Sequence, residues 1–354
     1  MGIVGEVSDA PSIDSVLARC RSVFPEWRAL SKEDYAKDFE WDDPKGFSSF
    51  TMAIRCHVLG VDPPAVLYRE LAGKENAILD FGTERDVFLL LGDHGIAAPC
   101  LHYDETCRIE GFYDGRTLTR HDLTDPDILK GIAVELHRFH QLEPDGLPKE
   151  TFFELLHDKW APLAGAVLGD QRHLFPPEEQ AMCDELAEIL SDETAAKVQR
   201  CLPSSPLSFS HNDTYHGNVM LLASGEIRLL DFEFSCLNHP AFDFANLFAE
   251  TAMRHGHTDP PHFSIAEPEY TRSDIETLVD HYLGCGDLAG IERDREFLRL
   301  VDETEDLIML SDYMYAMAAI PLAVEPMQKI RFLPYAYARW TRFSANYLNR
   351  FGDP

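Results

Sequence analysis

The sequence predicts an α+β fold with two lobes, a small β-rich lobe followed by a larger, mostly helical one. The chain has 354 residues, which is about twice the usual length of one compact domain. Strand-like patterns gather in the first third, whereas apolar residues at helical spacing dominate the remainder. A block of strand and loop at residues 207–234 interrupts the helical part. Two lobes arranged in this order predict a ligand site at their junction.

Each expected element follows from a local pattern. The segments at 51–58 (TMAIRCHV) and 65–71 (AVLYREL) are apolar, contain β-branched residues and flank a Pro-containing turn, so they predict a hairpin. The apolar run from Val87 to Leu91 predicts a helix near 82–94. Thr124 or Asp125, followed by Pro126, predicts a helix start. The other expected elements are one or two helices within 11–40, two short strands within 98–110, a glycine-containing joint at 111–115, and helices near 150–168, 177–200, 272–285, 292–320 and 334–350.

The composition excludes several classes of protein. Lys and Arg number 31 and Asp and Glu number 61, which gives a formal net charge of −30. Nucleic acid is therefore not an expected partner, because clustered cations hold phosphate backbones. No apolar stretch reaches the length of a membrane span. The eight cysteines include no C-x-x-C pair, which favours reduced thiols in a cytoplasmic protein over a zinc site.

The block at 207–234 indicates a reaction. It contains SHNDTYHGNVMLL and IRLLDFEFS, in which Asp213 precedes Asn218 by five positions and Asp231 follows Asn218 by thirteen. Phosphoryl transfer needs a carboxylate near the attacking hydroxyl and oxygen ligands that hold Mg²⁺ against the phosphates. Protein kinases place a catalytic Asp five residues before a metal-binding Asn, with a second Asp on the next strand. The combined spacing favours this chemistry over a chance polar loop followed by a hairpin.

Three segments carry a resemblance to a known family. His211-Asn212-Asp213 with Gly217-Asn218, then LDFEFS at 230–235, then AFDFANLFAE at 241–250 resemble the choline/ethanolamine kinase family. That family belongs to the protein-kinase-like and aminoglycoside-phosphotransferase-like group, and the similarity extends from about residue 46 to about residue 345. The resemblance implies a bilobal protein-kinase-like fold. It implies a nucleotide-binding lobe at 41–113 and a second lobe at 114–354 that carries the catalytic loop, metal site and amino-alcohol pocket. Residues 1–40 lie outside the resemblance, and their local pattern predicts an N-terminal helical extension.

The resemblance also implies roles for residues of the second lobe. Asp213 matches the catalytic base that accepts the proton of the substrate hydroxyl. Asn218 and Asp231 match the Mg²⁺ ligands, and Asn218 is also counted with the catalytic residues. Glu250 matches an acidic residue near the cationic nitrogen of the substrate. Asp243 matches a buried residue that braces the catalytic loop, so a structural role is expected for it.

Candidate ATP-binding residues lie in the first lobe. Arg69 takes the place where the family carries a phosphate-neutralising Arg, and Glu84 opens the next helix as its expected partner. A surface ion pair is the alternative reading of Arg69. Glu110 and Phe112 fall in the segment that resembles the lobe-connecting strand beside adenine, although a plain linker stays open. The remaining candidates are Ser48, Ser49 and Thr51, whose hydroxyls could replace backbone donors in a phosphate loop that retains only Gly46.

The expected substrate pocket departs from the family pattern. Two tryptophan positions of the family correspond here to Tyr315 and Ala318, and Thr251 stands where a Trp often follows the acidic residue. Tyr335 still matches a cage tyrosine, although tyrosines at helical spacing are also compatible with core packing. Aromatic faces attract a quaternary ammonium, whereas a primary ammonium donates three hydrogen bonds. A thinner cage therefore suits ethanolamine as well as choline.

The expected function is ATP- and Mg²⁺-dependent phosphorylation of ethanolamine, choline or both, the first step toward phosphatidylethanolamine and phosphatidylcholine. A small-molecule amino alcohol is the expected partner, and a homodimer is left open. One alternative is another small-molecule kinase of the aminoglycoside-phosphotransferase-like group. The other is a nucleotide-binding pseudokinase, which the glycine-poor loop motivates and the complete Asp213, Asn218 and Asp231 set disfavours.

Overall fold

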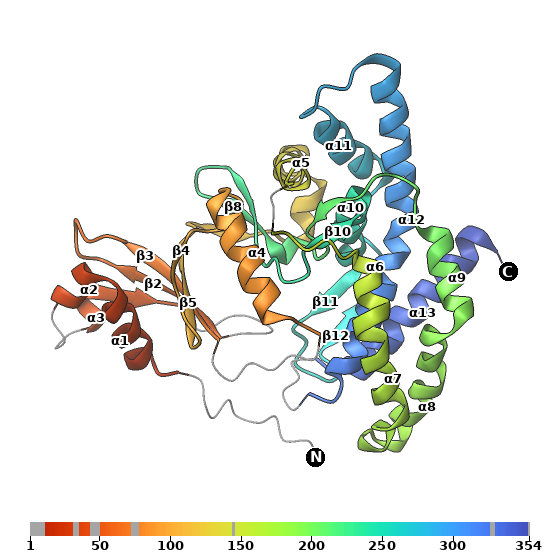
Figure 1. Cartoon of the computed structure of the whole chain (residues 1–354), viewed down its shortest axis with the longest axis horizontal. Coiled ribbons are helices and arrows are strands. Elements are labelled where there is room, and N and C mark those ends of the chain that lie inside the picture. Colours follow the sequence, from red (N-terminus) through yellow and green to blue (C-terminus); the bar gives the residue numbers. More distant parts are fainter. Residues whose placement is uncertain are drawn as a thin grey trace. The chain divides into compact units, whose positions relative to one another are not determined.

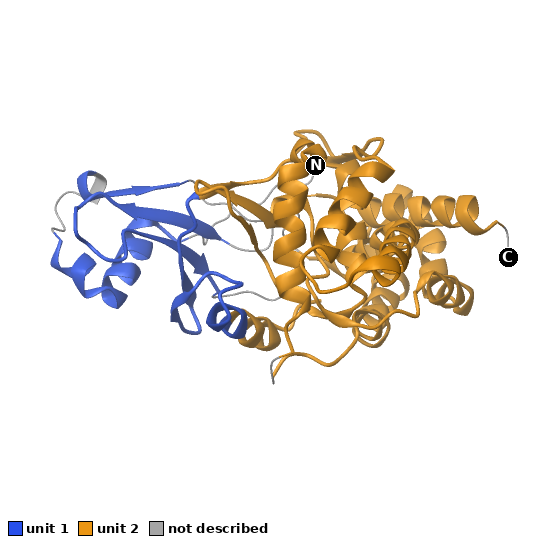
Figure 2. Ribbon diagram, turned by 90° about the horizontal axis from the view of Figure 1, so that it is seen from above, with its two compact units in different colours: residues 1–75, 89–114 blue, residues 76–88, 115–354 orange. Residues whose placement is uncertain are grey.

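The described part of the chain separates into two units of different secondary structure (Figure 2). The computed structural model describes residues 11–30, 35–42, 50–71, 78–143, 146–325 and 330–352. Unit 1 comprises Met1–Glu75 and Leu89–Asp114, and unit 2 comprises Asn76–Phe88 and Gly115–Pro354. The helix α4 (Phe81–Asp93) is divided between them. This division differs from the sequence-based scheme, which placed all of that helix in the first lobe and set residues 1–40 apart.

A five-stranded antiparallel sheet forms the centre of unit 1, in the order β1-β2-β3-β5-β4 (Figure 1). Its strands are β1 (Phe39–Trp41), β2 (Thr51–Cys56), β3 (Ala65–Glu70), β4 (Cys100–Tyr103) and β5 (Cys107–Gly111). The predicted hairpin is present as β2 and β3, with Met52 opposite Tyr68 and Ile54 opposite Val66. All four of these side chains are buried, so alternate positions of both strands supply the core face.

The helices at the start of the described chain belong to the same core. They are α1 (Ile13–Val23), α2 (Pro25–Ala29) and α3 (Tyr35–Asp38). Trp27 is 0% exposed, and its ring centroid lies 5.4 Å from that of Phe24 and 5.0 Å from that of Phe39. The indole Nε1 of Trp27 donates a hydrogen bond to the carbonyl oxygen of Pro63 at 2.8 Å. The described part of the predicted extension is therefore packed into unit 1, because its apolar side chains cover the sheet.

Unit 2 is mainly helical. Besides part of α4, its helices of at least ten residues are α5 (Pro126–His140), α8 (Pro177–Leu186), α9 (Asp192–Cys201), α10 (Pro240–Ala249), α11 (Arg272–Leu283), α12 (Gly290–Leu322) and α13 (Phe332–Phe351), and the shorter ones include α6 (Phe152–Leu155) and α7 (Ala161–Gly169). The helix predicted near 177–200 is two helices, because Ser191 is extended and caps α9 by accepting a hydrogen bond from the backbone N–H of Thr194. None of the helices in the described residues is long and apolar enough to cross a membrane.

Short strands of unit 2 position the loop-and-strand block. A three-stranded antiparallel sheet has the order β6-β8-β9, and two further pairs are β7 with β10 and β11 with β12. The strands are β6 (Gly115–Thr117), β7 (Ser208–Ser210), β8 (Val219–Leu222), β9 (Ile227–Leu229), β10 (Cys236–Asn238), β11 (Met253–His255) and β12 (Phe263–Ile265). The buried ring of Phe139 on α5 stacks on Phe209 and Phe232, with centroids 5.4 and 5.7 Å apart. These aromatic contacts anchor β7 and the segment after β9 on the same helix.

Replacement of Trp27 by Ala tests whether the first helices support unit 1. We expect the free energy of unfolding to fall by about 3–5 kcal/mol, because a large buried side chain is lost and a cavity remains. Urea unfolding followed by circular dichroism measures this change. The control is Leu59→Ala in the same unit, since Leu59 is 99% exposed. Equal unfolding midpoints for the two variants would contradict the packing described here.

Candidate active site

The loop at residues 211–218, which we call the Asp213 loop, follows β7 and is held by Asp243 on α10. Asp243 is 0% exposed, and its Oδ2 and Oδ1 accept hydrogen bonds from the backbone N–H groups of His211 (2.9 Å) and Asn212 (2.7 Å). The Nε2 atom of His140 lies 2.9 Å from Asp243 Oδ2. Burial alone would raise the pKa of Asp243, but the hydrogen bonds from the His140 side chain and the His211 backbone lower it. A charged carboxylate thus braces the loop, in the structural role expected for this residue.

Side chains of the Asp213 loop also bind the segment that carries Asp231. His211 Nε2 lies 2.8 Å from the carbonyl oxygen of Leu230. Asn212 has a left-handed backbone (φ 66°), and its Nδ2 donates to the carbonyl oxygen of Phe234 at 2.9 Å. Asn238 Nδ2 in turn donates to Asn212 Oδ1 at 2.8 Å. These bonds fix the residues on both sides of Asp231 to the loop.

Asp213 and Asn218 are in direct contact. Asn218 Nδ2 donates to the carbonyl oxygen of Asp213 at 3.0 Å and to its Oδ2 at 2.8 Å. Gly217 permits this close turn, because a Cβ there would lie 2.4 Å from the ring of Tyr215. Burial raises the pKa of Asp213 to about 8, and the charges of Asp231 and Glu250 act in the same direction. Hydrogen bonds from Tyr315 and Asn218 lower the pKa of Asp213.

Asn218 and Asp231 carry oxygen atoms of the kind that could bind a magnesium ion. Asn218 Nδ2 donates two hydrogen bonds to Asp213, which orients the amide so that its oxygen is the atom that could bind a cation. The backbone N–H of Leu230, directly before Asp231, donates to the carbonyl oxygen of Asn218 at 2.8 Å. Asp231 itself has a left-handed backbone (φ 63°). Amide and carboxylate oxygens are the protein ligands that Mg²⁺ prefers.

Tyr315 on α12 contacts Asp213 through its hydroxyl, which donates to Asp213 Oδ1. Asn246 on α10 donates from Nδ2 to the Tyr315 hydroxyl oxygen at 3.3 Å. The predicted base therefore has one donor on each carboxylate oxygen, Asn218 on Oδ2 and Tyr315 on Oδ1. The family resemblance implies a cage position for Tyr315, with core packing as the alternative, and neither predicts this hydrogen bond.

Arg339 on α13 joins the other two predicted substrate-binding residues, and sequence analysis missed it. Its guanidinium is 0% exposed and donates to Glu250 Oε1, to Asp312 Oδ1 at 2.9 Å and to the Tyr335 hydroxyl at 2.6 Å. The same guanidinium carbon lies 4.6 Å from the ring centroid of Tyr315 and 5.0 Å from that of Tyr335. The protein's own cation thus lies over both predicted cage rings.

Helical spacing in the sequence could have indicated that Arg339 and Asn246 lie beside predicted site residues. Tyr335 and Arg339 are four positions apart, so they share a face of α13. Asp243, Asn246 and Glu250 follow one another by three and four positions, which places them on one face of α10 and the turn that continues it.

The predicted ATP-binding residues that the structure describes divide between the two units. Arg69 on β3 forms an ion pair with Glu110 on β5, with Nε and Oε1 3.6 Å apart. Thr51 lies opposite Arg69 in the β2–β3 register. The guanidinium of Arg55 lies 4.7 Å from the ring centroid of Phe112. Glu84 lies in the part of α4 that belongs to unit 2, so its pairing with Arg69 stays a prediction. Ser48 and Ser49 lie outside the described residues.

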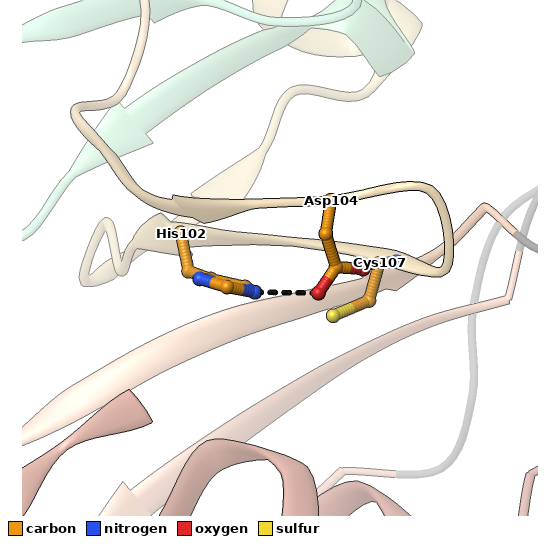
Figure 3. Close-up of side chains that lie close together, drawn as sticks. All are labelled: His102, Asp104 and Cys107. Carbon is orange, nitrogen blue, oxygen red and sulfur yellow. Dashed lines mark hydrogen bonds and ion pairs between the residues drawn. The ribbon is translucent and has the colours of Figure 1, made fainter. Parts of the chain in front are cut away.

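A second cluster of potential ligands lies in unit 1, at the β4–β5 turn (Figure 3). His102 Nε2 lies 2.8 Å from Asp104 Oδ2, and Cys107 Sγ is close to both. However, the guanidinium of Arg19 donates to Asp104 Oδ2 and, through Nε, lies 3.5 Å from Cys107 Sγ. The other oxygen of Asp104 accepts from the backbone and hydroxyl of Thr106. The protein's own cation already neutralises this carboxylate, which makes the cluster an ion-paired turn.

Comparison with known proteins identifies the family. A family model described as choline/ethanolamine kinase matches residues 52–344. The chain belongs to the choline/ethanolamine kinase family. The family resemblance inferred from the sequence is thus confirmed. Among curated relatives, "Probable choline kinase 2" of Arabidopsis thaliana is 27% identical over 286 residues, which cover 80% of this chain and 77% of that protein.

Solved structures of this family are similar in fold. A choline kinase from Cryptosporidium parvum aligns with a TM-score of 0.73 at 21% identity, over 95% of each chain. An ethanolamine kinase from Plasmodium vivax aligns with a TM-score of 0.69 at 20% identity, over 97% of this chain and 92% of that one. At these identities the likeness is evidence of the fold alone. It confirms the predicted kinase-like α+β fold, with a small β-rich part and a larger helical part.

Replacement of Arg339 by Met tests the buried charge cluster. We expect the free energy of unfolding to fall by about 3–5 kcal/mol, because Glu250 and Asp312 then lose their buried cation. The matched control is Arg342→Met. Arg342 Nε lies 3.3 Å from Asp312 Oδ2 and its side chain is 19% exposed. A smaller loss is expected for this variant, because Asp312 and Glu250 both keep Arg339. Urea unfolding of both variants measures the difference, and equal losses would show that Arg339 has no special place in the cluster.

Proposed function

We propose that this protein transfers the γ-phosphoryl group of ATP to the hydroxyl of ethanolamine, choline or both, with Mg²⁺ bound by Asn218 and Asp231. Membership of the choline/ethanolamine kinase family supports the reaction class. The observation that carries the residue assignment is the hydrogen-bonded connection from Asp213 through Asn218 to the residue before Asp231. A carboxylate and two oxygen ligands in one connected loop are what phosphoryl transfer requires of a protein.

In the proposed mechanism, Asp213 accepts the proton of the substrate hydroxyl as that oxygen attacks the γ-phosphorus and ADP leaves. Asp213 must be a charged carboxylate to accept this proton, and the hydrogen bonds that it receives from Asn218 and Tyr315 favour the charged form. Asn218 holds one carboxylate oxygen and keeps its amide oxygen for the cation. Bound Mg²⁺ would neutralise charge on the phosphates. The braced loop keeps these atoms fixed between turnovers, which is the main contribution of a protein to this reaction.

The substrate's cationic nitrogen is proposed to lie near Glu250, with Tyr335 at the same end of the pocket. Glu250 pairs with Arg339, and Asp312 pairs with both Arg339 and Arg342, so the cluster has no excess negative charge of its own. The assignment of Glu250 to the ammonium group therefore rests on its match to the family's acidic residue. The rings of Tyr315 and Tyr335 already contact Arg339. This arrangement does not favour a quaternary over a primary ammonium, so both amino alcohols are proposed as substrates.

Nucleotide contacts from unit 1 are proposed for the residues that the sequence singled out. They are Arg69, Thr51, Glu110, Phe112, Ser48 and Ser49, with Glu84 of unit 2 as the partner of Arg69. The ion pair between Arg69 and Glu110 also supports the alternative reading of Arg69 as a structural residue, and substitution by Ala with measurement of the KM for ATP separates the two. A cytoplasmic location is proposed as well, because all eight cysteines are free thiols.

Steady-state kinetics with ethanolamine and choline at saturating Mg·ATP test the proposal. We expect turnover with at least one of them, and Asp213→Asn should lower kcat by about 10²–10⁴-fold because the base is lost. The control is Asp287→Asn, an exposed carboxylate in unit 2. Turnover only with aminoglycosides or amino-acid-derived alcohols would favour another small-molecule kinase. Nucleotide binding without any turnover would favour a pseudokinase.

Substitution of Asp231 by Asn tests the metal site. We expect the Mg²⁺ concentration for half-maximal turnover to rise by roughly tenfold or more, because a neutral amide replaces a charged oxygen ligand. Titration of Mg²⁺ at fixed ATP measures this change, and chelation by EDTA should abolish turnover of the native chain. Asp287→Asn again serves as the control. An unchanged Mg²⁺ requirement in Asp231→Asn would remove this residue from the metal site.

A further inference from the structure

The hydroxyl of Tyr315 is bound on both sides inside unit 2. It donates to Asp213 Oδ1 and accepts from Asn246 Nδ2. Burial raises the pKa of Tyr315 well above its ordinary value, so the hydroxyl keeps its proton and acts as a donor. Only one orientation satisfies both partners, since the amide nitrogen of Asn246 can only donate and the hydroxyl proton is then left for Asp213 Oδ1.

Residues behind Tyr315 fix that orientation. The carbonyl oxygen of Thr214 can only accept, so the amide atom of Asn246 that faces it is the nitrogen, and Asn246 Oδ1 accepts from the Ser311 hydroxyl at 2.6 Å. Asn246 Nδ2 is then directed to the Tyr315 hydroxyl and to the carbonyl oxygen of Thr214, 3.2 Å away. Ser311 and Asn246 are both 0% exposed. Each group in this chain therefore donates a hydrogen bond to the next: Ser311 to Asn246, Asn246 to Tyr315, and Tyr315 to Asp213.

The ring of Tyr315 is held as firmly as its hydroxyl. Arg339 from α13 lies over the ring at 4.6 Å from the centroid, and its guanidinium is fixed by Glu250 and Asp312. A cation on the ring face is attracted by the π electrons and restrains the ring plane. The side chain therefore has little freedom to rotate away from Asp213.

We propose that Tyr315 is a positioning residue that holds the Asp213 carboxylate for proton transfer. Asn218 binds one carboxylate oxygen and Tyr315 binds the other, so the carboxylate cannot rotate about its Cβ–Cγ bond without breaking a hydrogen bond. Each oxygen keeps a further lone pair, and Oδ1 is left able to accept the proton of the substrate hydroxyl. This inference rests on the proposed function, because it assigns Asp213 as the base.

The first test compares Tyr315→Phe with Tyr313→Phe. Tyr313 lies two residues earlier on α12, is 0% exposed, and its hydroxyl has no hydrogen-bond partner among the described residues. Both variants lose the same atom from the same helix, but only Tyr315→Phe frees Asp213. We expect kcat to fall by about 10-fold in Tyr315→Phe with the KM for Mg·ATP unchanged, and no change in Tyr313→Phe. An equal or higher kcat in Tyr315→Phe would overturn the proposal.

A double-mutant cycle separates positioning from a general structural effect. If Tyr315 acts through Asp213, its hydroxyl has nothing to position in Asp213→Asn. We therefore expect Tyr315→Phe to reduce kcat in the native background and to leave the residual rate of Asp213→Asn unchanged. The same fold reduction in both backgrounds would mean that Tyr315 acts independently of Asp213, which contradicts the proposal.

A spectroscopic measurement distinguishes failure of this inference from failure of the proposed function. In protein labelled with ¹³C at tyrosine Cζ, the Tyr315 signal is assigned by its absence in Tyr315→Phe. We expect that signal to shift in Asp213→Asn and the Tyr313 signal to stay, whether or not any amino alcohol is turned over. An unmoved Tyr315 signal overturns the contact itself. A shifted signal without turnover on either amino alcohol overturns the proposed function and, with it, the assignment of Asp213 as the base.

Discussion

The first N–H groups of the Asp213 loop have no regular secondary structure to accept their hydrogen bonds, and the buried carboxylate of Asp243 accepts them instead. A charge in this position is stable only when it is fully paired. His140 at the end of α5 completes the pairing, so three parts of unit 2 meet at one side chain. The position of Asp213, and with it the contacts of Asp213 with Asn218 and Tyr315, depends on this arrangement.

The sequence predicted those features that depend on neighbouring residues. The β2–β3 hairpin follows from alternate burial, and the contact between Asp213 and Asn218 follows from a spacing of five within one loop. The hairpin of β11 and β12 was not predicted, because three-residue strands leave no periodic pattern. Helix α9 begins where Ser191 caps it, which apolar spacing alone does not reveal.

Contacts between distant helices were beyond the reach of the sequence. Arg339 and Glu250 are 89 positions apart, and Tyr315 and Asp213 are 102 apart. Whether such side chains meet depends on how α10, α12 and α13 pack. Resemblance to the family indicated that Glu250, Tyr315 and Tyr335 are candidate substrate-binding residues. It could not indicate that the buried Arg339 links Glu250 with Tyr335. Nor could it indicate that Tyr315 contacts Asp213 through its hydroxyl and not through its ring.

The backbone of Asp231 has a conformation that glycine adopts at less cost, since φ is 63°. An aspartate held there loses about 1 kcal/mol relative to an unstrained residue. If Asp231 holds the metal, the chain gives up stability at the very position that chemistry needs. Substitution of Asp231 by Gly would then increase the stability of the fold, and only the need for catalytic activity would select against it. In homologues that are no longer selected for activity, Asp231→Gly would raise stability and remove the metal ligand. The residue at this position would therefore distinguish active from inactive homologues.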